Sequence, residues 1–333
     1  MIRARMSRRQ LMLSGAAAAV TLSFAGSAFA QPAAYPNRPI RLIVPYPPGG
    51  GTDFFARTLG AKMSELLGQP VVIENKPGAA TAIGAEAVAK SAADGYTLLL
   101  GDTATYAVNP SLYRKLPYDP QRDLAPISLT GRFALLLVAN PSALAAASLK
   151  DLIDAAKRAP GKIDYASPGP GSPHHLAMEL FMQRAGVRLT HVPYKGAGPA
   201  VQDLLGGRVP VMFLDLATGG PHIKAGKLKA LAVASPQRIA PMPDVPTIGE
   251  SGFPGFVAWA WQGLSAPAAT PREIVARLNA EFAKAINDPA VRPRIVEAGI
   301  EPLQSTPEEF AAYARSERVK WAAVIKEGHI SVE

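Results

Sequence analysis

The chain contains no cysteine among its 333 residues. The fold therefore cannot rest on disulfide bonds, and neither a thiol nucleophile nor a lipid-anchored N-terminal cysteine is available. Hydrophobic residues make up 48% of the chain and charged residues 18%, which suffices for an ordinary globular core and suggests about two domains. Beyond the first thirty residues no apolar run reaches the length of a transmembrane helix, so the mature protein is expected to be soluble.

Sequence motifs for nucleotide, hydrolase and metal chemistry are also missing. The glycine run Gly49-Gly50-Gly51 is not followed by Gly-Lys-Ser/Thr, and the next helix opens with Phe54, so no phosphate-binding fingerprint is present. There is no Gly-x-Ser-x-Gly elbow. His174 and His175 are adjacent but lack the His-Glu-x-x-His spacing of a zinc site. Catalysis is the minor hypothesis, and neither a metal nor a cofactor is expected.

The first thirty residues are typical of an export signal. An uncharged apolar run over 11–25 precedes the small residues Ala28 and Ala30, which predicts a signal peptide over 1–30, cleaved after Ala30, and a periplasmic protein. An uncleaved membrane anchor is the alternative, and the choice between Sec and twin-arginine export stays open. The basic start of this segment consists of Arg3, Arg5, Arg8 and Arg9.

The net charge of the chain is positive, at +9. Removing residues 1–30 takes away four Arg and no acid, so 31 basic and 26 acidic residues remain and the charge becomes +5. A modest positive charge suits a small anionic ligand. The basic residues are scattered and form no stripe interleaved with aromatic residues, so nucleic-acid binding is not expected.

Strand-like and helix-like segments alternate along the mature chain. Such alternation predicts an α/β fold with parallel, doubly wound sheets covered by helices on both faces. The strands are expected over 40–46, 71–74, 96–100, 134–139, 162–166, 189–194, 209–214 and 228–234, and the helices over 54–67, 83–90, 149–158, 175–185 and 199–205.

The number of strands predicts two lobes with a ligand cleft between them. Ten or more strands exceed what one compact sheet usually holds. Residues 31–134 and 256–333 are expected to form a discontinuous lobe 1, and residues 135–255 lobe 2. Two C-terminal helix starts, at Thr270-Pro271-Arg272-Glu273 and at Thr306-Pro307-Glu308-Glu309, have a Thr cap and a Pro at the first turn.

The strongest local signal is the glycine-rich loop from Pro47 to Asp53, between a predicted strand and a predicted helix. Consecutive glycines let backbone N–H groups approach one point, and the first helical turn adds unpaired donors and a positive dipole. A carboxylate could be held there without an arginine. Thr52 or Asp53 is expected to cap the helix. The alternative is a purely structural tight turn.

A second loop of the same kind runs from Ser167 to Pro173 and precedes a helix that carries His175. Two such loops, one in each lobe, favour a ligand site in the cleft. A weak internal echo supports two similar lobes, because Val44-Pro45-Tyr46 before the first glycine run resembles Val192-Pro193-Tyr194 before Gly196-Ala197-Gly198.

Two tryptophans, Trp259 and Trp261, lie two residues apart on one face of a predicted strand. The ordinary interpretation of such a pair is core packing. The alternative is an apolar wall for a ligand, which makes Trp261 a candidate site residue.

Together these features resemble the solute-binding component of tripartite tricarboxylate transporters, the family first described as Bordetella uptake proteins. The similar stretches run in order over nearly the whole mature chain. They cover residues 35–46 with the glycine loop that follows, and also residues 94–99, 116–120, 191–196, 221–227 and 243–247.

The resemblance implies a fold like that of type II periplasmic binding proteins. It also implies a non-catalytic, two-lobed monomer that closes on a small organic carboxylate and delivers it to two integral membrane subunits. It also implies the residues that contact the ligand. In lobe 1 these are Tyr46, Gly50, Gly51, Thr52, Asp53 and Thr103, and in lobe 2 they are Ser167, Gly171, Ser172, His175 and Tyr194.

One position departs from the family pattern. Many relatives carry an acidic residue where this chain has Leu214, and here Asp215 comes one place later. Since a one-residue shift on a strand turns a side chain to the other face, an amino-acid ligand is less secure and a plain carboxylic acid is favoured. Asp215 stays a candidate contact. The ligand itself stays open, and the rival function is a secreted α/β hydrolase-like enzyme acting on a carboxylate ester.

Overall fold

The computed structural model describes residues 35–332, and residues 38–333 form one compact unit. The predicted signal peptide over 1–30 and its cleavage after Ala30 lie outside the described residues. The strands are β1 (Ile40–Val44), β2 (Val71–Asn75), β3 (Thr97–Asp102), β4 (Leu124–Ala139), β5 (Asp164–Ser167), β6 (Thr190–Pro193), β7 (Val211–Asp215), β8 (Lys229–Val233), β9 (Trp259–Pro267) and β10 (Ile300–Pro302).

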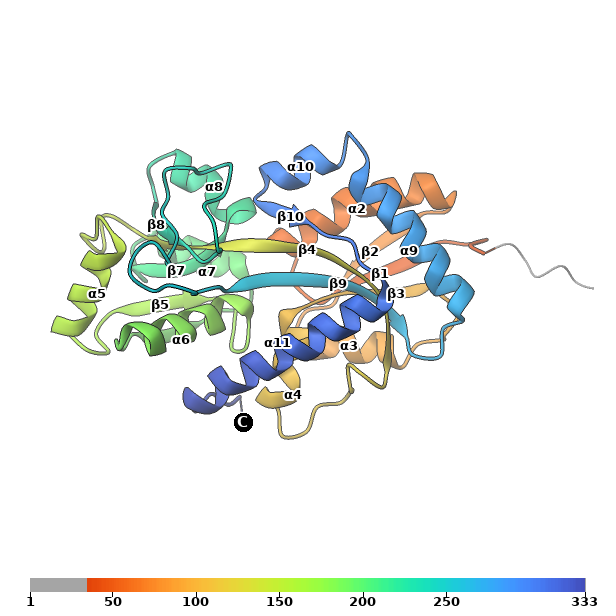
Figure 1. Ribbon diagram of the computed structural model, residues 1–333, viewed down its shortest axis with the longest axis horizontal. Coiled ribbons are helices and arrows are strands. Elements are labelled where there is room, and N and C mark those ends of the chain that lie inside the picture. The colour runs from red at the N-terminus through yellow and green to blue at the C-terminus, as the bar shows by residue number, and fades with distance from the viewer. Residues whose placement is uncertain (1–34, 333) are drawn as a thin grey trace, which may run out of the picture. The chain divides into compact units, whose positions relative to one another are not determined.

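Helices connect most of these strands, which confirms the α/β prediction (Figure 1). They are α2 (Gly51–Leu67), α3 (Ala82–Ala89), the π-helical turn η1 (Ala104–Val108), α4 (Asn109–Leu112), α5 (Leu149–Arg158), α6 (Pro173–Ala185), α7 (Ala197–Leu205), α8 (Leu216–Lys224), α9 (Arg272–Asn287), α10 (Arg292–Glu297) and α11 (Pro307–Glu327).

Two groups of parallel strands lie at opposite ends of the sheet path. β1 pairs in parallel with β2 and β3, and β5 pairs in parallel with β6 and β7. In Figure 1, α2, α3 and α9 surround the first group, and α5, α6 and α7 surround the second. The carboxyl ends of these parallel strands carry the predicted loops.

Strand β4 joins the two groups. Its sixteen residues pair antiparallel with β9 as far as Ala134, and from Leu135 onward they pair with β7 and β8. The hydrogen-bonded order is therefore continuous, β2-β1-β3-β9-β4-β7-β5-β6, with β8 and β10 also on β4. Parallel pairing within each group agrees with the predicted doubly wound lobes, and two long antiparallel strands, β4 and β9, run between the two groups.

Two of the predicted helix caps can be compared with the structure. The Thr306 hydroxyl accepts from the Glu309 N–H and the Glu309 carboxylate accepts from the Thr306 N–H, so the capping box at α11 is confirmed. The Thr270 cap was wrong, because α9 begins one residue later, with Pro271 at the cap position and no side-chain bond.

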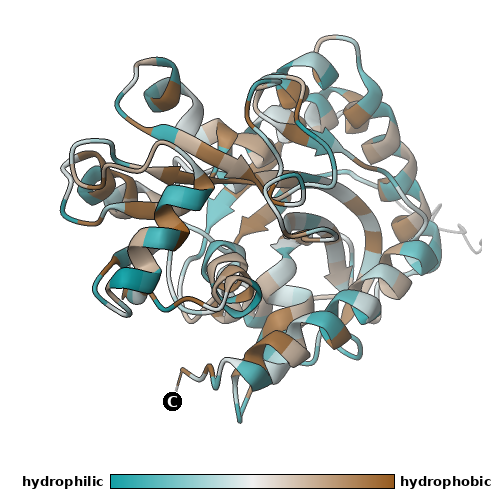
Figure 2. Cartoon of the chain, turned by 60° about the vertical axis from the view of Figure 1, so that its left-hand side comes forward, coloured by the Kyte–Doolittle hydropathy of each residue, from teal (hydrophilic) through white to brown (hydrophobic). Residues whose placement is uncertain are grey.

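The core consists of aliphatic and aromatic side chains on both faces of the strands. All nine residues of β9 are buried, as are most of those of β4. Figure 2 shows hydrophobic segments along the central strands and alternating hydrophilic and hydrophobic segments along the surrounding helices, which is the pattern of helices with one buried face. Within residues 35–332 no helix combines the length and the apolar character needed to cross a membrane.

Candidate functional site

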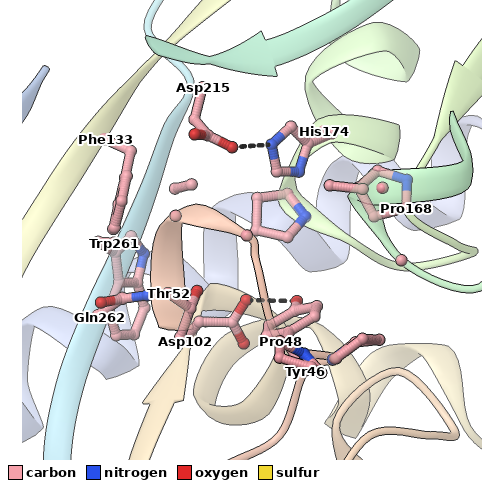
Figure 3. Close-up of a pocket in the computed structure, with 18 of the residues that line it drawn as sticks. Tyr46, Pro48, Thr52, Asp102, Phe133, Pro168, His174, Asp215, Trp261 and Gln262 are labelled. Carbon is pink, nitrogen blue, oxygen red and sulfur yellow. Dashed lines mark hydrogen bonds and ion pairs between the residues drawn. The ribbon is translucent and has the colours of Figure 1, made fainter. Parts of the chain in front are cut away.

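A cavity of about 710 Å³, including the solvent-filled space at its mouth, lies among the loop before α2, the starts of α6 and α7, the end of β7 and the strand β9 (Figure 3). It is lined by Tyr46, Pro47, Pro48, Gly50, Gly51, Thr52, Asp102, Phe133, Pro168, Pro173, His174, Gly196, Ala197, Gly198, Pro199, Asp215, Ala260, Trp261 and Gln262.

The glycine run itself forms the start of α2. The helix begins at Gly51, three residues earlier than predicted, with Gly50 as an extended N-cap and no side-chain cap. Its first-turn N–H groups have no partner within the helix and lie at the positive end of its dipole. A Cβ on Gly51 would lie 2.9 Å from Phe133 Cε1 and 3.0 Å from Asp215 Oδ1, whereas one on Gly50 would meet nothing within 4 Å. Glycine is therefore required at position 51 by close packing.

The expected cap residues of this helix serve other purposes, so the cap prediction was wrong. Asp53 accepts hydrogen bonds from the Gly49 N–H at 3.1 Å, from Arg57 Nε at 2.9 Å and from Asn75 Nδ2 at 3.0 Å. Burial opposes ionisation of Asp53, but these bonds outweigh it and lower its pKa. Asp53 thus holds the loop in shape, and Thr52 accepts a hydrogen bond from Gln262 Nε2.

A hydrogen-bonded acid lies at one side of the cavity. The Tyr46 hydroxyl donates to Asp102 Oδ2 at 2.7 Å, while Oδ1 accepts from the N–H and the hydroxyl of Thr105, each at 3.1 Å. Burial raises the pKa of Asp102, and burial together with the Asp102 charge raises the pKa of Tyr46 well above its usual value. The Tyr46 proton is therefore committed to Asp102, which leaves the phenol oxygen as an acceptor.

A second acid, Asp215, lies at the opposite side of the cavity (Figure 3). It caps α8 by accepting from the Thr218 N–H at 2.9 Å, and its Oδ2 lies 3.6 Å from His174 Nε2. That separation is an ion-pair distance and too long for a hydrogen bond. Burial opposes ionisation of Asp215, but the His174 imidazole and the Thr218 bonds lower its pKa. Within residues 35–332 neither ring nitrogen of His174 has a hydrogen-bond partner.

Asp215 lines the cavity, although it comes one residue after the position of Leu214, where many relatives carry an acidic residue. Leu214 packs in the hydrophobic core, and Asp215 ends strand β7 with its carboxylate toward the cavity. The one-residue shift therefore does not turn Asp215 away from the cavity, since side chains alternate along a strand and Leu214 points into the core.

The second predicted loop is held by its own hydrogen bonds. Ser167 Oγ lies 2.6 Å from His191 Nε2 and accepts from the Gly169 N–H at 3.1 Å. The Ser172 hydroxyl caps α6 by accepting from the His175 N–H. His175 Nδ1 in turn accepts from the Gly171 N–H at 3.1 Å. Because these groups already bond to one another, they shape the loop that begins α6.

Strand β9 supplies the apolar wall. Trp261 is fully buried and lines the cavity, so its ring packs in the core and also forms part of the wall. Its indole N–H donates to Glu317 at 3.0 Å, and its backbone N–H donates to the Thr103 hydroxyl at 3.0 Å. Trp259 instead packs beneath the Arg132 guanidinium, 4.4 Å from the ring centroid.

The structure brings only some of the predicted site residues together. Six of them line the cavity: Tyr46, Gly50, Gly51, Thr52, Asp215 and Trp261. The others lie beside it, namely Asp53, Thr103, Ser167, Gly171, Ser172, His175 and Tyr194, of which Ser172 and Tyr194 border a neighbouring hollow. Contact of any of these residues with a ligand stays a prediction.

Sequence analysis missed several lining residues. Asp102 ends strand β3, and a buried strand followed by an acid was a usable signal. His174 was considered only as a metal ligand. Among residues 35–332, no group of three or more His, Asp or Glu side chains is arranged to hold a metal ion. Phe133 and Gln262 carry no motif, and only the pairing of distant strands places them at the cavity.

Fold and cavity together define a solute-binding protein, and comparison with known proteins gives the family. Residues 55–330 match the family described as tripartite tricarboxylate transporter family receptor, and the chain belongs to this family. Protein BugT of Bordetella pertussis is 44% identical over 294 residues, which cover 88% of this chain and 90% of BugT.

Two solved structures are similar over their whole length. Rpa4515 of R. palustris with adipate is 37% identical with a TM-score of 0.86, over 90% of this chain and 100% of that one. MatC of Rhodopseudomonas palustris with bound malate is 35% identical with a TM-score of 0.82, over 87% of this chain and 100% of that one. The family is one of transporter receptors, so the chain is a periplasmic solute-binding receptor rather than a hydrolase.

Proposed function

We propose that this receptor captures a small organic carboxylate in the cavity at the start of α2 and delivers it to a transporter with two integral membrane subunits. The observation that carries the proposal is a helix whose uncapped first turn opens on the cavity at Gly50 and Gly51. Adipate and malate in two similar receptors support a carboxylate as the ligand class.

Backbone donors at the starts of α2 and α7 supply most of the affinity for the anion. α2 and α7 begin at the cavity, and the first-turn N–H groups of a helix have no partner within it. α6 also begins there, but Pro173 has no N–H and the His175 N–H is bonded to Ser172. α7 follows Gly196 at φ 108°, where a Cβ would lie 3.0 Å from Pro47. Charge-assisted bonds from such N–H groups hold a carboxylate without a cationic side chain.

Two lobes close on the ligand, with lobe 1 formed by residues 31–134 and 256–333 and lobe 2 by residues 135–255. The change of β4 pairing partners between Ala134 and Leu135 supports this division. So does the lining of the cavity, since Gly51 and Asp102 come from lobe 1 while His174 and Asp215 come from lobe 2. The mature receptor acts as a monomer and begins at Gln31, after cleavage following Ala30.

Calorimetric titration of residues 31–333 with small carboxylates tests the function. We expect one site with micromolar affinity or better. Titration of the uncharged amide of the same acid is the control and should give no heat, because the helix starts bind the negative charge. Ester hydrolysis that disappears in Ser172→Ala would instead support the hydrolase.

A further inference from the structure

The charges on the cavity wall are unusual for a receptor of anions. Asp102 and Asp215 line the cavity and are each only 4% exposed. Of the described residues on this wall none is Lys or Arg, and His174 alone among them can carry a positive charge. The wall therefore carries more negative than positive side-chain charge.

The side of the cavity at Asp102 offers hydrogen-bond acceptors. Tyr46 donates its proton to Asp102, so its oxygen can only accept from a ligand. Gln262 is 1% exposed and lines the same cavity, and its Oε1 has no partner within residues 35–332. A buried acceptor without a partner is costly, so a ligand that brings a donor is favoured here.

The side at Asp215 already places a carboxylate beside α2. Asp215 Oδ1 lies 3.0 Å from where a Cβ on Gly51 would be, so this carboxylate stands at the first residue of the helix. His174 Nε2 lies 3.6 Å from Asp215 Oδ2. Figure 3 shows Asp102 and Asp215 at opposite sides of the cavity. Because an acid lies at each side, the end of a spanning ligand that is remote from its bound carboxylate faces an acidic side chain.

We propose that the cavity selects monocarboxylates that carry a hydrogen-bond donor, an ammonium group above all, at the end remote from the carboxylate, and that it disfavours dicarboxylates. This inference rests on the proposed carboxylate capture. An ammonium group meets Asp102 or Asp215 as a charge-assisted donor, whereas a second carboxylate meets like charge in a partly dehydrated space.

Four ligands with five carbon atoms each test the selectivity by calorimetry: δ-aminovalerate, δ-hydroxyvalerate, valerate and glutarate. They share one carboxylate and differ only in the remote group. We expect δ-aminovalerate to bind at least about tenfold more tightly than valerate, glutarate to bind more weakly than valerate, and the hydroxy acid to lie between the first two.

Asp102→Asn and Asp215→Asn keep the side-chain shape and remove the charge. Asn also serves well as an N-cap, so α8 should persist in the second variant. Each variant should reduce the preference for δ-aminovalerate over glutarate by about tenfold or more. Asp154→Asn, on the outer face of α5 where the carboxylate is paired with Lys150, is the matched control and should leave the preference unchanged.

Several results would overturn the selectivity. Glutarate binding more tightly than valerate contradicts it while leaving carboxylate capture intact. An unchanged preference in both Asn variants that melt cooperatively also contradicts it, and the wild-type order decides if a variant does not fold. Binding by none of the four ligands contradicts the proposed carboxylate capture itself, and the selectivity with it.

Discussion

Replacing Gly51 by alanine perturbs the contact between α2 and the end of β7. The new methyl carbon would lie 2.9 Å from Phe133 Cε1, 3.0 Å from Asp215 Oδ1 and 3.2 Å from Asp215 Cγ. Carbon atoms in good contact lie about 3.5–4.0 Å apart, so both side chains must move. Asp215 has little freedom, since it is bonded to Thr218 as the cap of α8.

Overpacking of this kind costs about 1–3 kcal/mol, which corresponds to a loss of about fivefold to 150-fold in affinity if it falls on the ligand-bound arrangement. The contact with Asp215 joins the two proposed lobes, so its strain should appear mainly in ligand binding. Phe133 belongs to the same lobe as Gly51, and displacing its ring should cost some thermal stability. Calorimetry and a thermal melt of the same variant separate the two effects.

Gly50→Ala is the matched control. The Gly50 backbone, at φ −89°, is one that alanine adopts freely, and its Cβ would meet nothing within 4 Å. We expect a smaller loss of affinity than for Gly51→Ala and no change in melting. Equal affinity of Gly51→Ala and the unaltered protein, or a larger loss for Gly50→Ala, would show that the approach of Asp215 to α2 is not part of the ligand-bound arrangement.

Three further predictions concern groups around the cavity. Glu317→Leu should leave the indole N–H groups of Trp261 and Trp321 without their shared acceptor, whereas Glu317→Gln should retain an acceptor. We expect a shift of tryptophan fluorescence and weaker ligand binding in the Leu variant only. Burial and the nearby His175 lower the pKa of His191 to about 3. Below about pH 6.5 the His191 imidazole binds a proton in the unfolded chain but not in the folded one. The free energy of unfolding should therefore fall as the pH is lowered from about 6.5 towards 3, by at most about 1.4 kcal/mol per pH unit and by less because the ring is partly exposed. Urea titrations should show a flatter pH profile for His191→Gln, and an identical profile would contradict the assignment. Ser172→Ala should destabilise the protein by about 1 kcal/mol in urea titrations by removing the α6 cap, and no change would refute that role.

Local sequence signals predicted the elements well and their assembly less well. The glycine loop, the capping box at Thr306 and the alternation of strands and helices depend on neighbouring residues. The continuity of β4 depends on a change of partners at Ala134 and on register shifts, which come from distant strands. The predicted caps Thr52 and Asp53 failed because α2 starts inside the glycine run.

The same distinction applies to the cavity. Tyr46 and Gly51 belong to one recognisable loop, and both line it. Asp102, His174 and Gln262 reach it from three separate elements, and no spacing in the sequence links them. Ser167 and Ser172 of the second loop instead form hydrogen bonds with His191 and His175, and these pairings become visible only in the folded structure.

The central claim is that backbone N–H groups at helix starts hold the ligand carboxylate in this cavity. Two-dimensional amide NMR of residues 31–333, titrated with valerate, tests it most directly. We expect the largest shift changes at the amides of Gly51, Thr52, Ala197 and Gly198, and little change at the Arg57 guanidinium, which is paired with Asp53. Changes concentrated on arginine or lysine side chains, with those four amides unaffected, would contradict the claim.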